Sequence, residues 1–435
     1  MRQSRWKWVS VVGALLALLL VAGSLRVADR ADEASGNGPP TAPSTGDAGP
    51  LRRAPGFLYG RVETVRASYE GRIRFGGVQE AFWTDTFDAF KKENPWQSFV
   101  DPEALIDEEP VEVFGVSLGT RKRPVNLRRP FRVAFGDIVA LEPEVSNLFV
   151  ELKSGATLRL DRMGADDFGD GLRVWDADRG VVDLDELSVR RIEFLAPPPM
   201  RAPRRLYGTV RSSAGEFTGF IQWDREACVD TDAIVGRSDE GSSELSFGQV
   251  RRVERTADGS LWSLRDGRRI ELTGTRSVGS GHRGVAVTDE RYGRAVVGWS
   301  SFESLDLREA GSGPGYESFA AGGPLRGRVT LIDDSTLEGR LVYDLDESET
   351  TDTLDVSRGD VDYALRLSDV AVIEPRHDVH CATPPRVTLR GGQTLELDCS
   401  GDLAPTHAGV LVFRGETPTY AAWSAVRLVE LFDTP

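Results

Sequence analysis

The chain has 435 residues, a formal net charge of −15 at pH 7 and only three cysteines. Because so acidic a chain repels a phosphate backbone, this charge argues against nucleic acid as a partner. Three cysteines are too few for a disulfide-dense scaffold, and the length allows several small hydrophobic cores.

The N-terminal region (1–25) predicts a signal peptide or a membrane anchor. Three basic residues, Arg2, Arg5 and Lys7, precede a long uncharged run, which is the pattern of an export signal. Small residues at 22–24 resemble a cleavage site, but the run is also long enough for a short membrane span. We therefore expect export to the cell envelope, in the periplasm or at the cell surface, as a secreted or membrane-anchored protein. Residues 26–53 are rich in Gly, Pro, Ala, Ser and Asp and predict a disordered linker.

An eight-residue pattern occurs six times in the rest of the chain. Its clearest copy, Trp423 to Glu430, has an aromatic residue, then small residues, then apolar residues three and six places on, and a closing acid. Apolar residues three apart cannot share one face of a strand, but they suit a single 3₁₀ turn that leads into a strand. We interpret the closing acids as solvated strand ends or arginine partners; they are Glu142, Glu193, Glu254, Asp306, Glu374 and Glu430.

A glycine recurs in the hairpins that open alternate segments, with an aromatic residue four places later. A glycine at such a site lets a long strand bend across two sides of a small barrel. The glycines are Gly71, Gly219 and Gly339, and the aromatic residues are Phe75, Trp223 and Tyr343.

One of these segments resembles the Sm-like and SH3-like small β-barrels. Its hairpin alternates apolar residues from Val329, turns at Asp333-Asp334, and returns through Gly339 to Tyr343, as in the first Sm motif. The segment differs from the second Sm motif, because Leu367 stands where that family has Gly, and the basic RNA-binding loop is absent. The resemblance implies the barrel fold without RNA binding. The chain is also similar to exported bacterial proteins with repeated Gly-x-Ile-x-Trp-Asp hairpins.

These patterns predict an all-β protein of six tandem, five-stranded SH3/Sm-like barrels, arranged as three odd-even pairs. The first barrel carries an insertion at 83–129, and a linker at 311–323 precedes the fifth. The predicted modules are 54–142, 143–200, 201–256, 257–310, 324–376 and 377–435.

The insertion in the first module is the candidate binding surface, because a long loop with clustered aromatic residues is where a modular protein presents a ligand site. The alternative is a lid that buries its aromatic residues against the first two modules. The candidate residues are Trp83, Phe87, Phe90, Trp96 and Phe99.

An acidic segment is a weaker candidate for a metal site. Asp166, Asp167 and Asp170 could offer oxygens to Ca²⁺, but they lack the spacing of an EF-hand loop and its closing Glu. We interpret the segment as a solvated loop.

The cysteines leave three alternatives open. Cys381 and Cys399 flank a predicted hairpin, so in an exported chain they could form a disulfide or remain free thiols. The third alternative is a zinc site together with His377, His380 and His407. Cys228 has no evident partner.

The sequence lacks the nucleophile elbow, the zinc-protease motif, the phosphate-binding loop and the dinucleotide fingerprint. We therefore expect no cofactor and a non-enzymatic β-repeat protein that binds an envelope protein or organises the envelope. The alternative is an envelope glycan-binding or glycan-cleaving protein. It would use the aromatic insertion or the strand-end residues Trp223, Trp299 and Trp423.

Overall fold

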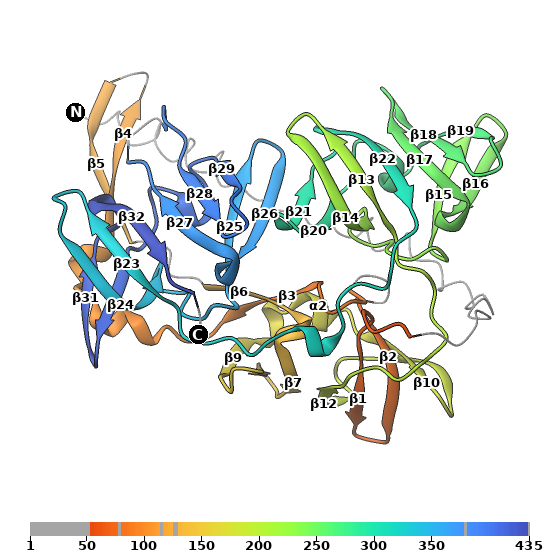
Figure 1. Ribbon diagram of the computed structural model, residues 1–435, viewed down its shortest axis with the longest axis horizontal. Helices are drawn as coiled ribbons and strands as arrows, with labels where there is room; N and C mark the ends of the chain where they lie inside the picture. Colours follow the sequence, from red (N-terminus) through yellow and green to blue (C-terminus); the bar gives the residue numbers. More distant parts are fainter. Residues whose placement is uncertain (1–52, 77–79, 114–115, 125–128, 378–380, 434–435) are drawn as a thin grey trace, which may run out of the picture. The chain divides into compact units, whose positions relative to one another are not determined.

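The computed structural model describes residues 53–76, 80–113, 116–124, 129–377 and 381–433. Within them the predicted all-β class is confirmed: three large antiparallel sheets have ten, twelve and eight strands (Figure 1). The α-helical part of these ranges is the four-residue α2 (Asp166–Gly169). The predicted signal peptide or anchor and residues 26–52 lie outside the described residues. In the described ranges no helix is both long and apolar enough to cross a membrane.

The first sheet has the strand order β11-β10-β2-β1-β12-β7-β8-β9-β3-β6. Its strands are β1 (Tyr59–Thr64), β2 (Ser68–Phe75), β3 (Thr86–Lys91), β6 (Arg129–Ala134), β7 (Ile138–Pro143), β8 (Asn147–Leu152), β9 (Thr157–Asp161), β10 (Leu172–Asp176), β11 (Gly180–Leu184) and β12 (Val189–Phe194).

The second sheet has the order β16-β15-β19-β18-β17-β22-β13-β14-β20-β21-β26-β25. Its strands are β13 (Tyr207–Ser212), β14 (Gly215–Trp223), β15 (Ala233–Ser238), β16 (Gly241–Ser246), β17 (Val250–Arg255), β18 (Gly259–Leu264), β19 (Arg269–Thr273), β20 (Val285–Asp289), β21 (Gly293–Val297), β22 (Phe302–Arg308), β25 (Thr353–Arg358) and β26 (Val361–Arg366).

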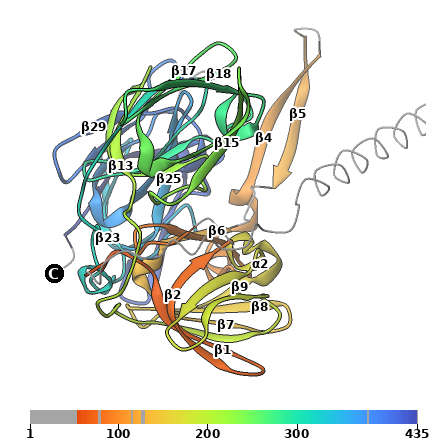
Figure 2. The ribbon, with the colours of Figure 1, turned by 90° about the vertical axis from the view of Figure 1, so that its right-hand side faces the viewer.

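The third sheet has the order β29-β28-β27-β32-β23-β24-β30-β31. Its strands are β23 (Arg326–Leu331), β24 (Thr336–Tyr343), β27 (Val370–Glu374), β28 (Arg386–Leu389), β29 (Thr394–Glu396), β30 (Val410–Arg414), β31 (Thr417–Ala421) and β32 (Val426–Leu431). A separate hairpin of β4 (Ile106–Val113) and β5 (Val116–Pro124) extends away from the large sheets (Figures 1 and 2).

Strand pairing differs from the expected order of tandem barrels. The hairpin β23–β24, for example, pairs with β32 and β30, whereas the strands that directly follow it, β25 and β26, belong to the second sheet. In the first two pairs, too, the opening hairpin joins the last three strands, and five intervening strands follow them in the sheet. Local patterns locate a hairpin but not the distant strand that covers its edge. No closed barrel is found in the described residues, so the barrel detail is not confirmed.

The six predicted segments each lead into a strand, but not all of them contain the predicted 3₁₀ turn. Four begin with a single 3₁₀ turn: η3 (Phe135–Asp137), η5 (Phe247–Gln249), η8 (Leu367–Asp369) and η10 (Trp423–Ala425). The strands that follow the six segments pair with one another: β7 pairs with β12, β17 with β22 and β27 with β32. These contacts join the two halves of each predicted odd-even pair.

The recurring tryptophans belong to the hydrophobic core or pack against it. Trp223 and Trp423 are buried, and Trp299 is partly buried against the same cluster. The Trp423 ring stacks on His407 with 3.7 Å between the ring centroids, and the Trp299 ring stacks on His282 at 4.8 Å.

Candidate functional site

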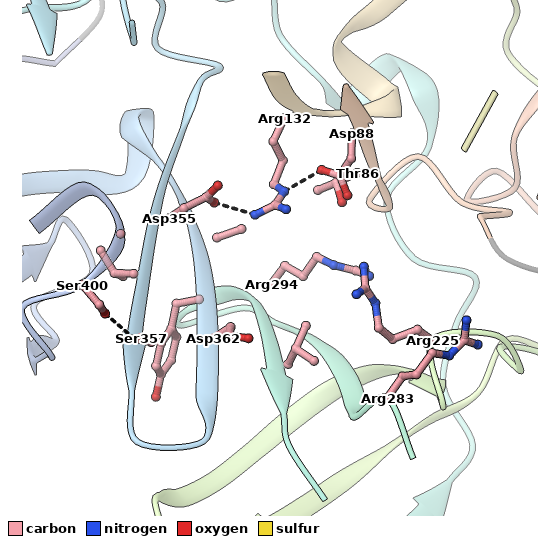
Figure 3. A pocket seen from close by; sticks show the side chains of 15 residues that line it. Thr86, Asp88, Arg132, Arg225, Arg283, Arg294, Asp355, Ser357, Asp362 and Ser400 are labelled. Carbon is pink, nitrogen blue, oxygen red and sulfur yellow. Dashed lines mark hydrogen bonds and ion pairs between the residues drawn. The ribbon is translucent and has the colours of Figure 1, made fainter. Parts of the chain in front are cut away.

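A cavity of about 370 Å³ lies where strands of the first and second sheets meet. Its walls come from β3 and β6, from the turn after β14, from the β20–β21 and β25–β26 hairpins, and from the loop before β30 (Figure 3). The charged side chains in the wall are Asp88, Arg132, Arg225, Arg283, Arg294, Asp355 and Asp362.

The turn after β14 carries Arg225 to the cavity wall. Asp224 and Arg225 both have left-handed backbone conformations, with φ of 53° and 57°. Non-glycine residues rarely adopt them, at a cost of about 1–3 kcal/mol each. Asp224 fixes the turn because its carboxylate accepts hydrogen bonds from the backbone N–H of Arg283 at 2.7 Å and the Ser277 hydroxyl at 2.6 Å. Although burial alone would raise it, these bonds hold the pKa of Asp224 below its ordinary value.

The positive charge of Arg132 is neutralised by two carboxylates of the wall. Its Nε lies 2.5 Å from the Asp88 carboxylate and its Nη1 lies 2.7 Å from the Asp355 carboxylate. Burial alone would lower the pKa of Arg132, but the two carboxylates raise it above its ordinary value. Arg132 therefore joins β3 to β25 with its charge compensated.

Arg283 is also engaged by its neighbours. Its Nη2 donates to the backbone carbonyl of Asp224 at 2.5 Å and lies 2.5 Å from a carboxylate oxygen of Glu226. This side chain therefore supports the turn that presents Arg225.

Arg225 and Arg294 differ from these two arginines. In the described part of the chain, neither has a carboxylate within ion-pair distance, and Arg294 donates to the neutral Gln222 side chain at 3.0 Å. Figure 3 shows the two side chains directed toward one another. Burial, and then the charge of Arg294, lowers the pKa of Arg225. The charges of Asp88 and Glu80 act in the opposite direction on Arg225, but neither carboxylate forms an ion pair with it. Two like charges thus face one cavity without an ion pair in the described residues.

Two buried carboxyl groups, Asp167 and Glu80, interact with the charge of Arg294 without forming an ion pair to it in the described residues. Burial is the main cause that raises the pKa of Asp167 to about 7 and the pKa of Glu80 well above its ordinary value. The charge of Arg294 acts in the opposite direction and favours the ionised form of both groups.

The wall can therefore bind an anion. Guanidinium groups form charge-assisted, often bidentate hydrogen bonds with carboxylates and phosphates. Hydroxyl groups of Thr86, Ser357 and Ser400 lie in the same wall and can bind other polar parts of a ligand.

The predicted aromatic surface is corrected at Trp83 and Phe87. Both side chains are fully buried in the core of the first sheet, where Trp83 packs edge-on against Phe194 at 5.8 Å. The segment expected to be a loop contains β3, and in a strand alternate side chains must enter the core. Phe90, also on β3, is half-buried.

Trp96 and Phe99 lie in η1 (Pro95–Phe99) and pack edge-on against Phe413 of β30, with ring centroids 5.8 and 5.6 Å apart. The segment therefore covers the third sheet, not the first two modules. Phe99 is 46% exposed and Trp96 is half-buried.

The three candidate calcium ligands do not converge. Asp166 and Asp170 are exposed at the ends of α2, whereas Asp167 is buried and accepts a hydrogen bond from the backbone N–H of Asp88 at 2.9 Å. In the described residues, no group of three or more His, Cys, Asp or Glu side chains could hold a metal ion.

Cys381 and Cys399 form a disulfide, with 6.2 Å between their Cα atoms. Of the histidines in the zinc alternative, His377 contacts the backbone carbonyl of Val426 at 2.6 Å, His407 is buried beneath Trp423, and His380 lies outside the described residues. Cys228 is buried outside the disulfide.

Sequence reasoning missed the arginine-lined wall. Its members come from β6, the turn after β14, the loop before β20, and β21, and no local pattern relates them. One local signal could have pointed to the wall: the charged Arg225 directly follows the recurrent aromatic-Asp pair, here Trp223-Asp224. The corresponding pair in the third sheet is followed by the apolar, buried Leu345.

Comparison of the chain with family models, with curated proteins and with solved structures gave no match.

Proposed function

We propose that this chain is an exported, non-enzymatic binding protein whose arginine-lined cavity holds an acidic group of its ligand. The observation that carries the proposal is the pair Arg225 and Arg294, two guanidinium groups that face one cavity and have no carboxylate within ion-pair distance in the described residues. The chain as a whole has a net charge of −15, so a local positive surface is an exception that selects its ligands.

An acidic segment of an envelope protein is the ligand that we favour. Asp88, Asp355 and Asp362 also line the cavity, so a ligand with dense negative charge would meet repulsion beyond the two arginines. One or two carboxylates on an otherwise neutral, polar segment match this pattern of charge.

Binding of labelled peptides tests the proposal. A peptide with a Glu-Glu step between Ser and Gly residues should bind at low salt, whereas its Gln-Gln counterpart should not. Arg225→Ala and Arg294→Ala should each weaken binding at least about tenfold, because a hydrogen bond to a charged group contributes about 1.5–3 kcal/mol. Arg251→Ala removes an exposed arginine outside the cavity and should have no effect. Equal binding of the two peptides would refute the role of the carboxylates.

Glycan binding is the alternative. Of the five aromatic residues of the expected surface, Phe99 is the exposed one, beside Phe413. A neutral oligosaccharide that binds wild type and not Phe99→Ala would favour this alternative. An oligogalacturonate that binds through Arg225 and Arg294 would instead assign the cavity to an acidic glycan.

We also propose an architecture of three copies of one unit, each made of five outer strands (the opening hairpin and the last three strands) and five inner strands between them, with the β4–β5 hairpin as an addition in the first copy. Support comes from the shared order of the outer strands: β11-β10-β2-β1-β12, β21-β20-β14-β13-β22 and β31-β30-β24-β23-β32. In this scheme each half is a variant of the small SH3/Sm-like barrel.

A further inference from the structure

β21 is the strand at the edge of the outer strands of the second unit, and it is paired with an inner strand of the third unit, β26. β21 pairs antiparallel with β26, with Arg294 opposite Ala364 and Val297 opposite Val361. The chain therefore contains one example of an outer edge strand that accepts an inner edge strand.

The strand that corresponds to β21 in the first unit is β11. In the β20–β21 hairpin, Asp289 lies opposite Gly293 and Val285 opposite Val297.

The β10–β11 hairpin has the same lengths and register: Asp176 lies opposite Gly180, and Leu172 opposite Leu184. Gly180 and Gly293 both have positive φ, 75° and 69°. Residues 180–184 therefore match 293–297 one to one.

The strand that corresponds to β26 in the second unit is β16. In the β25–β26 hairpin, Arg358 lies opposite Val361 and Thr353 opposite Arg366. In the β15–β16 hairpin, Ser238 lies opposite Gly241 and Ala233 opposite Ser246. Residues 241–246 therefore match 361–366 one to one.

β11 and β16 stand at the ends of their sheets, each with one strand neighbour in the described residues. Both are solvated: Val181 of β11 is 41% exposed, and Glu244 of β16 is exposed. An edge strand presents unpaired N–H and C=O groups that template pairing with another strand.

The other two corresponding edges carry a proline. Pro418 lies in β31 and Pro130 lies in β6, and a proline cannot donate a hydrogen bond to an added strand. In addition, the side chain of Arg129, the first residue of β6, forms an ion pair with Asp346 at 3.1 Å. Of these four corresponding edges, β11 and β16 contain no proline, and they are a complementary pair of one outer and one inner strand.

We propose that β11 of one copy of this chain pairs antiparallel with β16 of a second copy. Transferring the β21–β26 register places Val181 opposite Glu244, Val182 opposite Ser243, Asp183 opposite Ser242 and Leu184 opposite Gly241. No like charges face each other in this register, and Asp183 meets a hydroxyl group that can donate to it. Because the two surfaces differ, the contact is head-to-tail and extends the sheets from copy to copy.

Cysteine cross-linking of the full-length chain tests the register. A Val182→Cys chain mixed with a Ser243→Cys chain should give a disulfide-linked dimer under mild oxidation, because directly opposed strand residues have the separation that a disulfide needs. Val182→Cys with Ser242→Cys is the matched control and should not cross-link, since a shift of one residue points the side chains to opposite faces. The natural cysteines do not interfere, because Cys228 is buried and the other two form the disulfide.

Sedimentation of the full-length chain tests the assembly. Wild type should self-associate with rising concentration, Val182→Pro and Ser243→Pro should remain monomeric, and Val182→Thr should behave as wild type. A wild type that stays monomeric and does not cross-link would overturn the proposal. So would a Val182→Cys chain that cross-links mainly with itself, because that result assigns β11 to a symmetric contact.

Discussion

Gly339 lies directly opposite Gly327 in the ladder between β23 and β24, and neither position has room for a side chain. A Cβ on Gly339 would lie 2.1 Å from the carbonyl oxygen of Phe413, and a Cβ on Gly327 would lie 2.2 Å from that of Glu430. The same pairing joins Gly208 to Gly219 and Gly60 to Gly71. These glycines let neighbouring backbones approach closely.

Gly339→Val should therefore destabilise the protein by well over the roughly 1 kcal/mol that separates ordinary residues in strands. Denaturant unfolding of the full chain measures the effect. Gly311→Ala is the control, because a Cβ there meets nothing within 4 Å and φ is not positive. An unchanged midpoint for Gly339→Val would contradict the close approach and favour a glycine that clears space for a ligand.

Trp423→Ala should cost about 3–5 kcal/mol, the usual range for removing a large buried aromatic side chain. The ring is buried and stacks on His407, so the substitution leaves a cavity beside that histidine. Calorimetry should show a lower unfolding temperature than wild type. The exposed Leu187→Ala is the control, and a trace for Trp423→Ala that matches wild type would refute the core assignment.

The free energy of unfolding should depend on pH because of Asp344. Burial is the main cause that raises the pKa of Asp344 to about 7 in the folded protein. The ordinary pKa in an unfolded chain is about 3.9, so the folded state binds more protons between these two values. The contribution of Asp344 to the free energy of unfolding is therefore present at about pH 4 and is lost as the pH rises through about 7.

Asp344→Asn keeps an oxygen for the hydrogen bond from the backbone N–H of Ala408 but does not titrate. Denaturant unfolding at pH 5 to 8 should show a smaller loss of stability in this variant than in wild type. The opposite sign, a stability difference that favours wild type increasingly as the pH rises, would contradict the raised pKa.

Export is the prediction that the N-terminal pattern makes. A reporter fused after Pro55 should be active only outside the cytoplasm, because basic residues precede the apolar run. A reporter that is active in the cytoplasm would remove the expectation of an envelope partner.

The local features of this fold were predictable, because each depends on neighbours in the chain. Leu367 and Trp423 open 3₁₀ turns as their spacing predicts, and Gly71, Gly219 and Gly339 sit where backbones come close. Trp223 is buried, as an aromatic residue four places after such a glycine suggested.

Long-range features were not predictable. The hairpin at Gly339 is completed by β30 and β32, strands far along the chain, and nothing local identifies them. The sequence suggested that Trp83 and Phe87 lie in a loop, because the β4–β5 hairpin separates β3 from its partner strand β6 along the chain. The cavity depends on the same long-range pairing, since Arg225 and Arg294 share a wall with Asp355 only after β26 joins β21.

Isothermal titration with succinate tests the central claim most directly, because succinate presents two carboxylates to Arg225 and Arg294 without any other polar group. Wild type should bind succinate one to one, more weakly as salt rises, and the Arg225→Ala/Arg294→Ala double variant should give no measurable heat of binding. Arg251→Ala should behave as wild type. Succinate binding that is unchanged in the double variant, or absent in wild type at low salt, would contradict the assignment of an anion site to this cavity.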